Sequence, residues 1–111
     1  MEKQYNKLVR DKIPELIKER GGFSVYHILS KPEYTACLND KLKEEVEEYL
    51  QNNCVEELCD IFEVIKAIYT SMGITDAEFE EVRNEKIRRN GAFLDRIFLE
   101  KVVEEVPPSS V

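Results

Sequence analysis

Two helical segments joined by only three polar residues constrain the fold of this chain most strongly. Each segment has an apolar stripe at helical spacing: the first comprises Leu38, Leu42, Val46, Tyr49 and Leu50, and the second Val55, Leu58, Ile61, Phe62, Ile65, Ile68, Tyr69 and Met72. Between the two segments stand Gln51, Asn52 and Asn53. A connection this short forces consecutive helices to lie antiparallel. The sequence therefore predicts a helical hairpin at the centre of the fold.

Capping residues and glycines mark further helix boundaries. Ser30 and Glu33 have the spacing of a capping box, and so have Thr75 and Glu78. These boxes predict the starts of the second and fourth helices, while glycines follow the first, third and fourth. The first and third helices are predicted to begin at about residues 12 and 55, and the four helices to end at about residues 20, 50, 72 and 90.

Two short segments outside these helices have the composition of strands. Residues 24–29 read Ser-Val-Tyr-His-Ile-Leu, and residues 96–103 read Arg-Ile-Phe-Leu-Glu-Lys-Val-Val. We expect them to pair as a minor two-stranded β ribbon. Residues 104–111 include two prolines and are predicted to be a disordered tail. The predicted fold is thus mainly α, with one domain over residues 1–103.

The size of the chain predicts an oligomer. A chain of 111 residues buries a modest core, and a hairpin alone leaves one side of its apolar stripe uncovered. A second copy would close such an antiparallel helical bundle. We therefore expect a homodimer or a homotetramer.

Composition and charge exclude several classes of protein. No apolar run approaches the roughly 20 residues that cross a bilayer, and the first residues lack the apolar core of a signal peptide. The three cysteines include no CxxC pair and are expected to be reduced, as in a cytoplasmic protein. The net charge of −7 argues against nucleic-acid binding. It also means that an anionic substrate would need divalent cations between itself and the protein.

Four acidic residues are predicted to converge on one side of the hairpin. With about 100° per residue, Glu45 and Glu48 lie roughly 70° and 130° from the centre of the apolar stripe on their helix. Glu57 and Asp60 lie at similar angles, with the same sense of rotation, on the next helix. In an antiparallel pair such flanks meet on one side. Glu44, by the same count, points away and is predicted to be an ordinary solvent-exposed residue.

A convergence of carboxylates suggests a metal site, although an acidic surface patch is the alternative. Four carboxylates close together repel one another and raise each other's pKa unless a cation neutralises them. Ligation by oxygen alone suits a hard ion such as Mg²⁺ or Mn²⁺ better than zinc.

Several basic or polar residues are candidates for contacts with a substrate. Lys86 falls on the inward face of the fourth helix, where a buried ammonium is costly, although its long side chain can also extend to water. Lys41 lies one turn before Glu45 on the same flank and can pair with it or reach a phosphate. The full set of candidates is Arg10, Lys12, Lys41, Arg83, Lys86 and Asn90.

The acidic motifs resemble those of a known enzyme superfamily. Glu44-Glu45-x-x-Glu48 followed by Glu57-x-x-Asp60 is similar to the EExxE…ExxD signature of the MazG-like all-α nucleoside triphosphate (NTP) pyrophosphohydrolases. Residues 5–14, Tyr-Asn-Lys-Leu-Val-Arg-Asp-Lys-Ile-Pro, resemble a house-cleaning branch of this superfamily. The resemblance extends to about residue 99. The gap between Glu48 and Glu57 is shorter than in typical MazG proteins, which implies a more compact site.

The resemblance implies a function as well as a fold. It implies hydrolysis of a nucleoside triphosphate, of a non-standard or modified kind, to the monophosphate and pyrophosphate. The four acids would hold Mg²⁺, with Mn²⁺ as a substitute, and Glu45 would orient or deprotonate the attacking water. Two alternatives are the same chemistry on phosphoribosyl-ATP and a non-enzymatic acidic helical interaction module.

Overall fold

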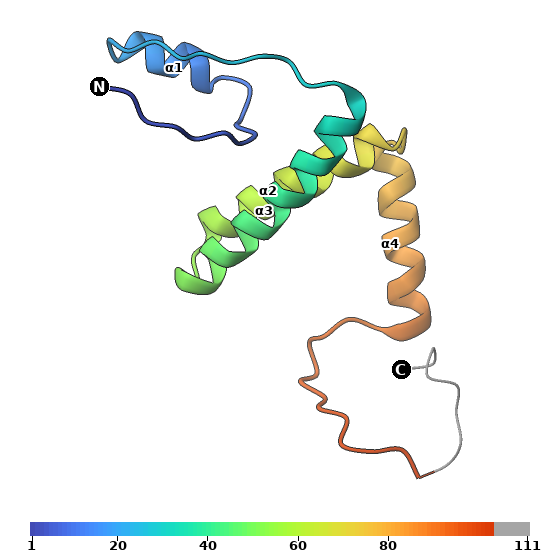
Figure 1. Cartoon of the computed structure of the whole chain (residues 1–111). Helices are drawn as coiled ribbons and strands as arrows, with labels where there is room; N and C mark the ends of the chain where they lie inside the picture. The colour runs from blue at the N-terminus through green and yellow to red at the C-terminus, as the bar shows by residue number, and fades with distance from the viewer. Residues whose placement is uncertain (104–111) are drawn as a thin grey trace. The chain divides into compact units, whose positions relative to one another are not determined.

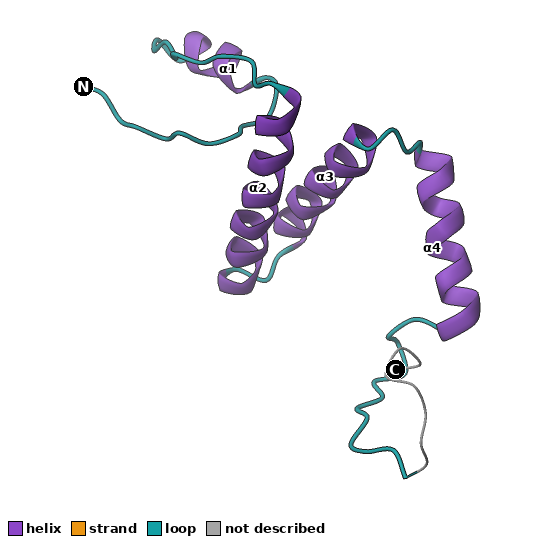
Figure 2. Ribbon diagram, turned by 45° about the vertical axis from the view of Figure 1, so that its right-hand side comes forward, coloured by secondary structure: helices purple, strands orange, loops and turns teal. Residues whose placement is uncertain are grey.

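The computed structural model describes residues 1–103 and contains four α-helices in that range (Figures 1 and 2). The mainly α prediction is confirmed. The observed boundaries lie within a few residues of the predicted ones. The helices are α1 (Ile13–Glu19), α2 (Lys31–Gln51), α3 (Val55–Ser71) and α4 (Asp76–Asn90). The predicted tail, residues 104–111, lies outside the described residues.

The capping box at the start of α2 forms as predicted. The Ser30 hydroxyl accepts a hydrogen bond from the Glu33 backbone N–H at 3.4 Å, and a Glu33 carboxylate oxygen accepts one from the Ser30 N–H at 3.2 Å. The hydrogen bonds from Ser30 also lower the pKa of Glu33. Two backbone donors that no helical carbonyl can satisfy are thereby paired, which fixes where α2 begins.

α2 and α3 form the predicted hairpin. The two helices pack against each other and lie side by side in both ribbon views (Figures 1 and 2). After the last turn of α2, the Asn52 N–H donates to the Glu48 carbonyl at 2.9 Å, and the Asn53 side chain donates to the Tyr49 carbonyl at 2.8 Å. The polar connection therefore satisfies carbonyl groups that the helix end leaves without partners.

The buried side of α2 differs from the predicted apolar stripe, because it includes an acidic residue and leaves part of the stripe exposed. Leu38 is only 2% exposed, and the neighbouring covered positions include Glu45, at 7%. Val46 and Leu50, which the prediction placed in the apolar stripe, are exposed.

On α3 the apolar surface is wider than α2 can cover. Val64 and Tyr69 are buried. Val55, Leu58 and Phe62, all members of the predicted stripe, are 66%, 49% and 54% exposed. A single partner helix can cover only one side of α3. The apolar residues of α3 extend beyond that side, so some of them stay exposed to solvent.

The end of α3 is fixed by a glycine and a buried tyrosine. Gly73 has φ +81°, a left-handed conformation that glycine adopts without steric cost. This turn lets the Ile74 N–H donate to the Tyr69 carbonyl at 3.0 Å. The Tyr69 hydroxyl donates to a carboxylate oxygen of Asp76, the first residue of α4, at 2.5 Å. This hydrogen bond, with Lys66 contributing, lowers the pKa of Asp76.

The predicted β ribbon is wrong, because residues 1–103 contain no strand. Val25 and Ile28 in the first segment are 93% and 88% exposed, and Ile97 and Phe98 in the second are 83% and 88% exposed. The two segments belong to separate compact units of the chain, which divide after Asp76. Composition favours a strand only where the backbone groups find a partner and one face is covered, and an isolated two-stranded ribbon is marginal in water.

No helix in the described part of the chain has the length and apolar character that a membrane span requires.

Candidate metal centre

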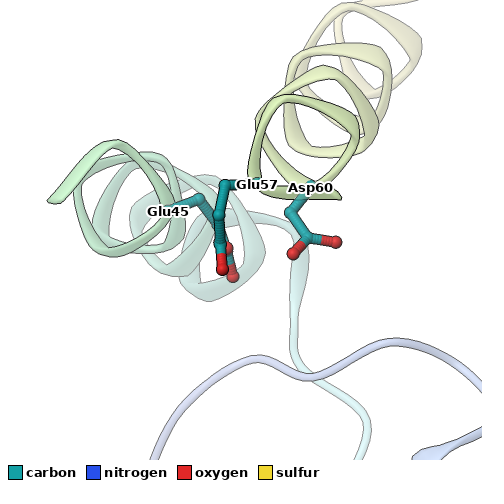
Figure 3. A group of neighbouring side chains, drawn as sticks. All are labelled: Glu45, Glu57 and Asp60. Atoms are coloured by element: carbon teal, nitrogen blue, oxygen red, sulfur yellow. The ribbon is translucent and has the colours of Figure 1, made fainter. Parts of the chain in front are cut away.

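Three carboxylates from the two hairpin helices come together. Glu45 of α2 and Glu57 and Asp60 of α3 each offer an oxygen, and these three oxygens lie within 4.8 Å of one another. Glu57 and Asp60 are three residues apart and therefore share one helix face. Figure 3 shows all three carboxylates directed to the same side of the helix pair. Three of the four residues predicted as metal ligands are thus neighbours in space.

Two of these carboxylates have an unsatisfied oxygen. Oε2 of Glu45 and Oε2 of Glu57 are buried and have no hydrogen-bond partner. A buried carboxylate oxygen without a partner costs free energy because its hydration is lost and not replaced. A divalent cation at this position would satisfy both oxygens. The donor set, oxygen atoms of carboxylates only, fits Mg²⁺ or Mn²⁺.

Glu48, the fourth predicted ligand, does not belong to this group of three. Its side chain is exposed. Its carboxylate lies close enough to that of Glu45 to help raise the pKa of Glu45. A role for Glu48 in metal binding therefore stays a prediction.

Lys41 lies next to the three acids and pairs with one of them. Its ammonium nitrogen is 3.3 Å from Oε1 of Glu45 and 2.5 Å from Oε2 of Glu44, and only 15% of its side chain is exposed. Burial disfavours the charge of Lys41, but the hydrogen bonds to Glu44 and Glu45 outweigh it and raise its pKa. The predicted pairing with Glu45 is confirmed. Lys41 pairs with Oε1 of Glu45 and leaves the buried Oε2 without a hydrogen-bond partner.

Burial raises the pKa of Glu45, against the opposing effect of Lys41. The nearby Glu48 carboxylate raises it further. A carboxylate held in this way is a stronger base than one in water, because its charged form is less well stabilised.

Glu44 departs from its prediction. Its two carboxylate oxygens lie 2.7 Å from the Lys7 ammonium and 2.5 Å from that of Lys41, and 29% of its side chain is exposed. Hydrogen bonds from Lys41 and then Lys7 lower its pKa. Angular position on α2 could not reveal this role, because one partner comes from the N-terminal segment. The three-residue spacing from Lys41 was the one available signal.

Arg10 contacts a candidate metal ligand. Its guanidinium nitrogen lies 2.7 Å from an oxygen of Asp60. Arg10 also lines an open groove of about 410 Å³, together with Leu58, Cys59, Phe62 and Glu63. Arg10 was predicted as a substrate-binding candidate, but its ion pair with Asp60 was not predicted.

The other substrate-binding candidates are exposed and lie outside the hairpin. Lys12 is exposed and precedes the first turn of α1. Arg83, Lys86 and Asn90 lie on α4, in the unit that begins at Ala77, and all three are exposed. Arg83 pairs with Glu80 on its own helix at 3.2 Å. Substrate contacts by these residues stay predictions.

Comparison with known proteins identifies one partial relative. A segment of 41 residues, 37% of this chain, is 56% identical to an uncharacterized protein of Mycolicibacterium smegmatis and covers 42% of that protein. No protein-family model matches the chain, and no solved structure matches it.

Proposed function

We propose that this chain is a Mg²⁺-dependent NTP pyrophosphohydrolase of the MazG-like kind, and that Glu45, Glu57 and Asp60 hold the metal. The observation that carries the proposal is the meeting of these three carboxylates, two of which have a buried oxygen without a partner. In an ordinary acidic surface patch, the carboxylate oxygens would be exposed to water and not buried. The spacing of the acidic motifs and the segment of residues 5–14 support the choice of reaction.

The reaction places separate demands on the residues of the site. Bound Mg²⁺ would supply charge neutralisation of the phosphate oxygens and so allow an anionic substrate to enter an acidic site. Lys41 holds Glu45 in place through Oε1. Glu45, with its raised pKa, is the residue proposed to orient the attacking water or accept its proton. Arg10 is exposed at the edge of the site, where a phosphate can reach it.

We also propose that the protein works as a homodimer or homotetramer. Val55, Leu58 and Phe62 leave an apolar face of α3 exposed beside the acids. A contiguous apolar face at a helix surface is typical of an interface. A second copy of the hairpin would cover it and complete a helical bundle.

The direct test is pyrophosphate release from a panel of standard and modified nucleoside triphosphates with Mg²⁺. We expect at least one substrate to be hydrolysed, and Glu57→Ala to lower its rate by about 100-fold or more, because a metal ligand is lost. Glu56→Ala is the matched control, since Glu56 is the exposed neighbour of Glu57 on α3. Undiminished release by Glu57→Ala, or no release from any substrate, would refute the proposal.

A further inference from the structure

The N-terminal segment is attached to both hairpin helices beside the acidic group. Lys7 pairs with Glu44 of α2 and Arg10 with Asp60 of α3, each at 2.7 Å. Arg10 is three positions after Lys7, so the backbone between them spans at most about 10 Å. Residues 7–10, which we call the N-terminal strap, therefore pass from one helix to the other next to the candidate metal ligands.

The two attachments differ in their relation to the metal. Glu44 is not one of the three converging carboxylates, whereas Asp60 is. A carboxylate that binds a divalent cation has less negative charge to offer an arginine, and the cation repels the guanidinium. Metal binding therefore competes with the Arg10–Asp60 pair and leaves the Lys7–Glu44 pair in place.

We propose that Arg10 exchanges partners during the reaction cycle: it pairs with Asp60 in the metal-free protein and passes to a phosphate of the substrate once the metal has taken Asp60. This inference rests on the proposed function, since it assumes that Asp60 is a metal ligand. Arginine suits the second partner, because its planar guanidinium can donate two parallel hydrogen bonds to a phosphate.

The surroundings of Arg10 permit the exchange. Its side chain is 57% exposed, so no packing holds it on Asp60. It also lines the groove formed with Leu58 and Phe62, so after release it remains at the edge of the site. The exposed Lys7–Glu44 pair involves no candidate ligand, so metal binding leaves it unchanged. The metal thus binds first and prepares the phosphate contact.

Two variants of the strap separate this exchange from a structural role. Arg10→Gln removes the charge that competes with the metal, while Lys7→Gln removes an equal charge whose partner is not a ligand. We expect Arg10→Gln to bind Mn²⁺ about two- to fivefold more tightly than wild type, the range that an exposed ion pair supports. We expect the same variant to bind inorganic triphosphate, added with Mg²⁺, about tenfold more weakly. Lys7→Gln should change both affinities by less than about twofold.

The experiment is a titration of each intact variant with Mn²⁺ alone, followed by calorimetry with inorganic triphosphate and Mg²⁺. Tighter Mn²⁺ binding together with weaker triphosphate binding in Arg10→Gln supports the exchange, because a merely structural residue would weaken both. Mn²⁺ binding no tighter than that of Lys7→Gln, or unchanged triphosphate binding, overturns it while leaving the metal site intact. Failure of the wild type to bind Mn²⁺ overturns the proposed function itself, and this inference with it.

Discussion

At the scale of single residues, the group formed by Glu45, Glu57 and Asp60 lowers the stability of the metal-free protein. Glu45 is 7% exposed, and one of its oxygens has no partner. Lys41 compensates only in part, because burial still raises the pKa of Glu45. The residues that form the site therefore work against the stability of the metal-free fold, which is common where a site is built for a ligand.

Because the pKa of Glu45 is raised, the contribution of this residue to the free energy of unfolding falls as the pH rises. The fold favours the protonated form, so the contribution of Glu45 is complete below its ordinary pKa of 4.5 and is lost as the pH rises through the raised value. In Glu45→Gln the side chain is neutral at every pH. We therefore expect the free energy of unfolding of this variant, relative to wild type, to increase as the pH rises above 4.5.

Urea unfolding with a chelator present, across a series of pH values, measures this difference. Added Mg²⁺ should stabilise the wild type and have little effect on the variant, since a ligand stabilises only the state that binds it. A difference between the two proteins that stays constant with pH would show that Glu45 is not strained by burial.

Tyr69 links the end of α3 to the first residue of α4. The hydroxyl of this buried side chain donates to Asp76 at 2.5 Å. Removing the hydroxyl in Tyr69→Phe should lower the free energy of unfolding, because a hydrogen bond to a charged group is lost. It should also return the pKa of Asp76 toward its ordinary value, which NMR titration of that carboxyl would detect. An unchanged Asp76 titration would contradict this account.

At the scale of elements, the helices were predictable because their signals are local. The capping box of Ser30 and the glycine after α3 act within a few residues of the boundaries that they set. The ribbon was not predictable, because a strand depends on a partner from elsewhere in the chain. The convergence of Glu45, Glu57 and Asp60 followed from helix angle. The pairs of Lys7 with Glu44 and of Arg10 with Asp60 did not, because they depend on the path of the N-terminal segment.

The hairpin depends on one side chain more than on any other in the described part of the chain. Leu38 is 2% exposed, and few other apolar side chains are buried. Leu38→Ala removes most of that side chain from the contact between α2 and its surroundings. We expect a loss of about 3 kcal/mol in the free energy of unfolding, measured by urea denaturation of the metal-free protein. A loss below about 1 kcal/mol would mean that Leu38 is not a core residue.

At the scale of the whole molecule, the proposed oligomer rests on the exposed apolar face of α3. Phe62 is 54% exposed beside Leu58, on the hairpin that carries the acids. We expect the protein to sediment as a dimer or tetramer at micromolar concentration, and Phe62→Glu to shift it toward a smaller species, because a charge is costly in an apolar interface. Phe93→Glu, at a position 98% exposed and outside the hairpin, is the matched control. A wild-type monomer at micromolar concentration would contradict the proposed assembly.

Direct titration with Mn²⁺, followed by the electron paramagnetic resonance signal of the free ion, tests the central claim that carboxylates from α2 and α3 together hold a divalent cation. The account predicts saturable binding that Glu56→Ala retains and that both Glu45→Gln and Glu57→Ala lose, since each helix supplies part of the ligand set. Binding that survives either of these two ligand substitutions, or no saturable binding at all, would contradict it.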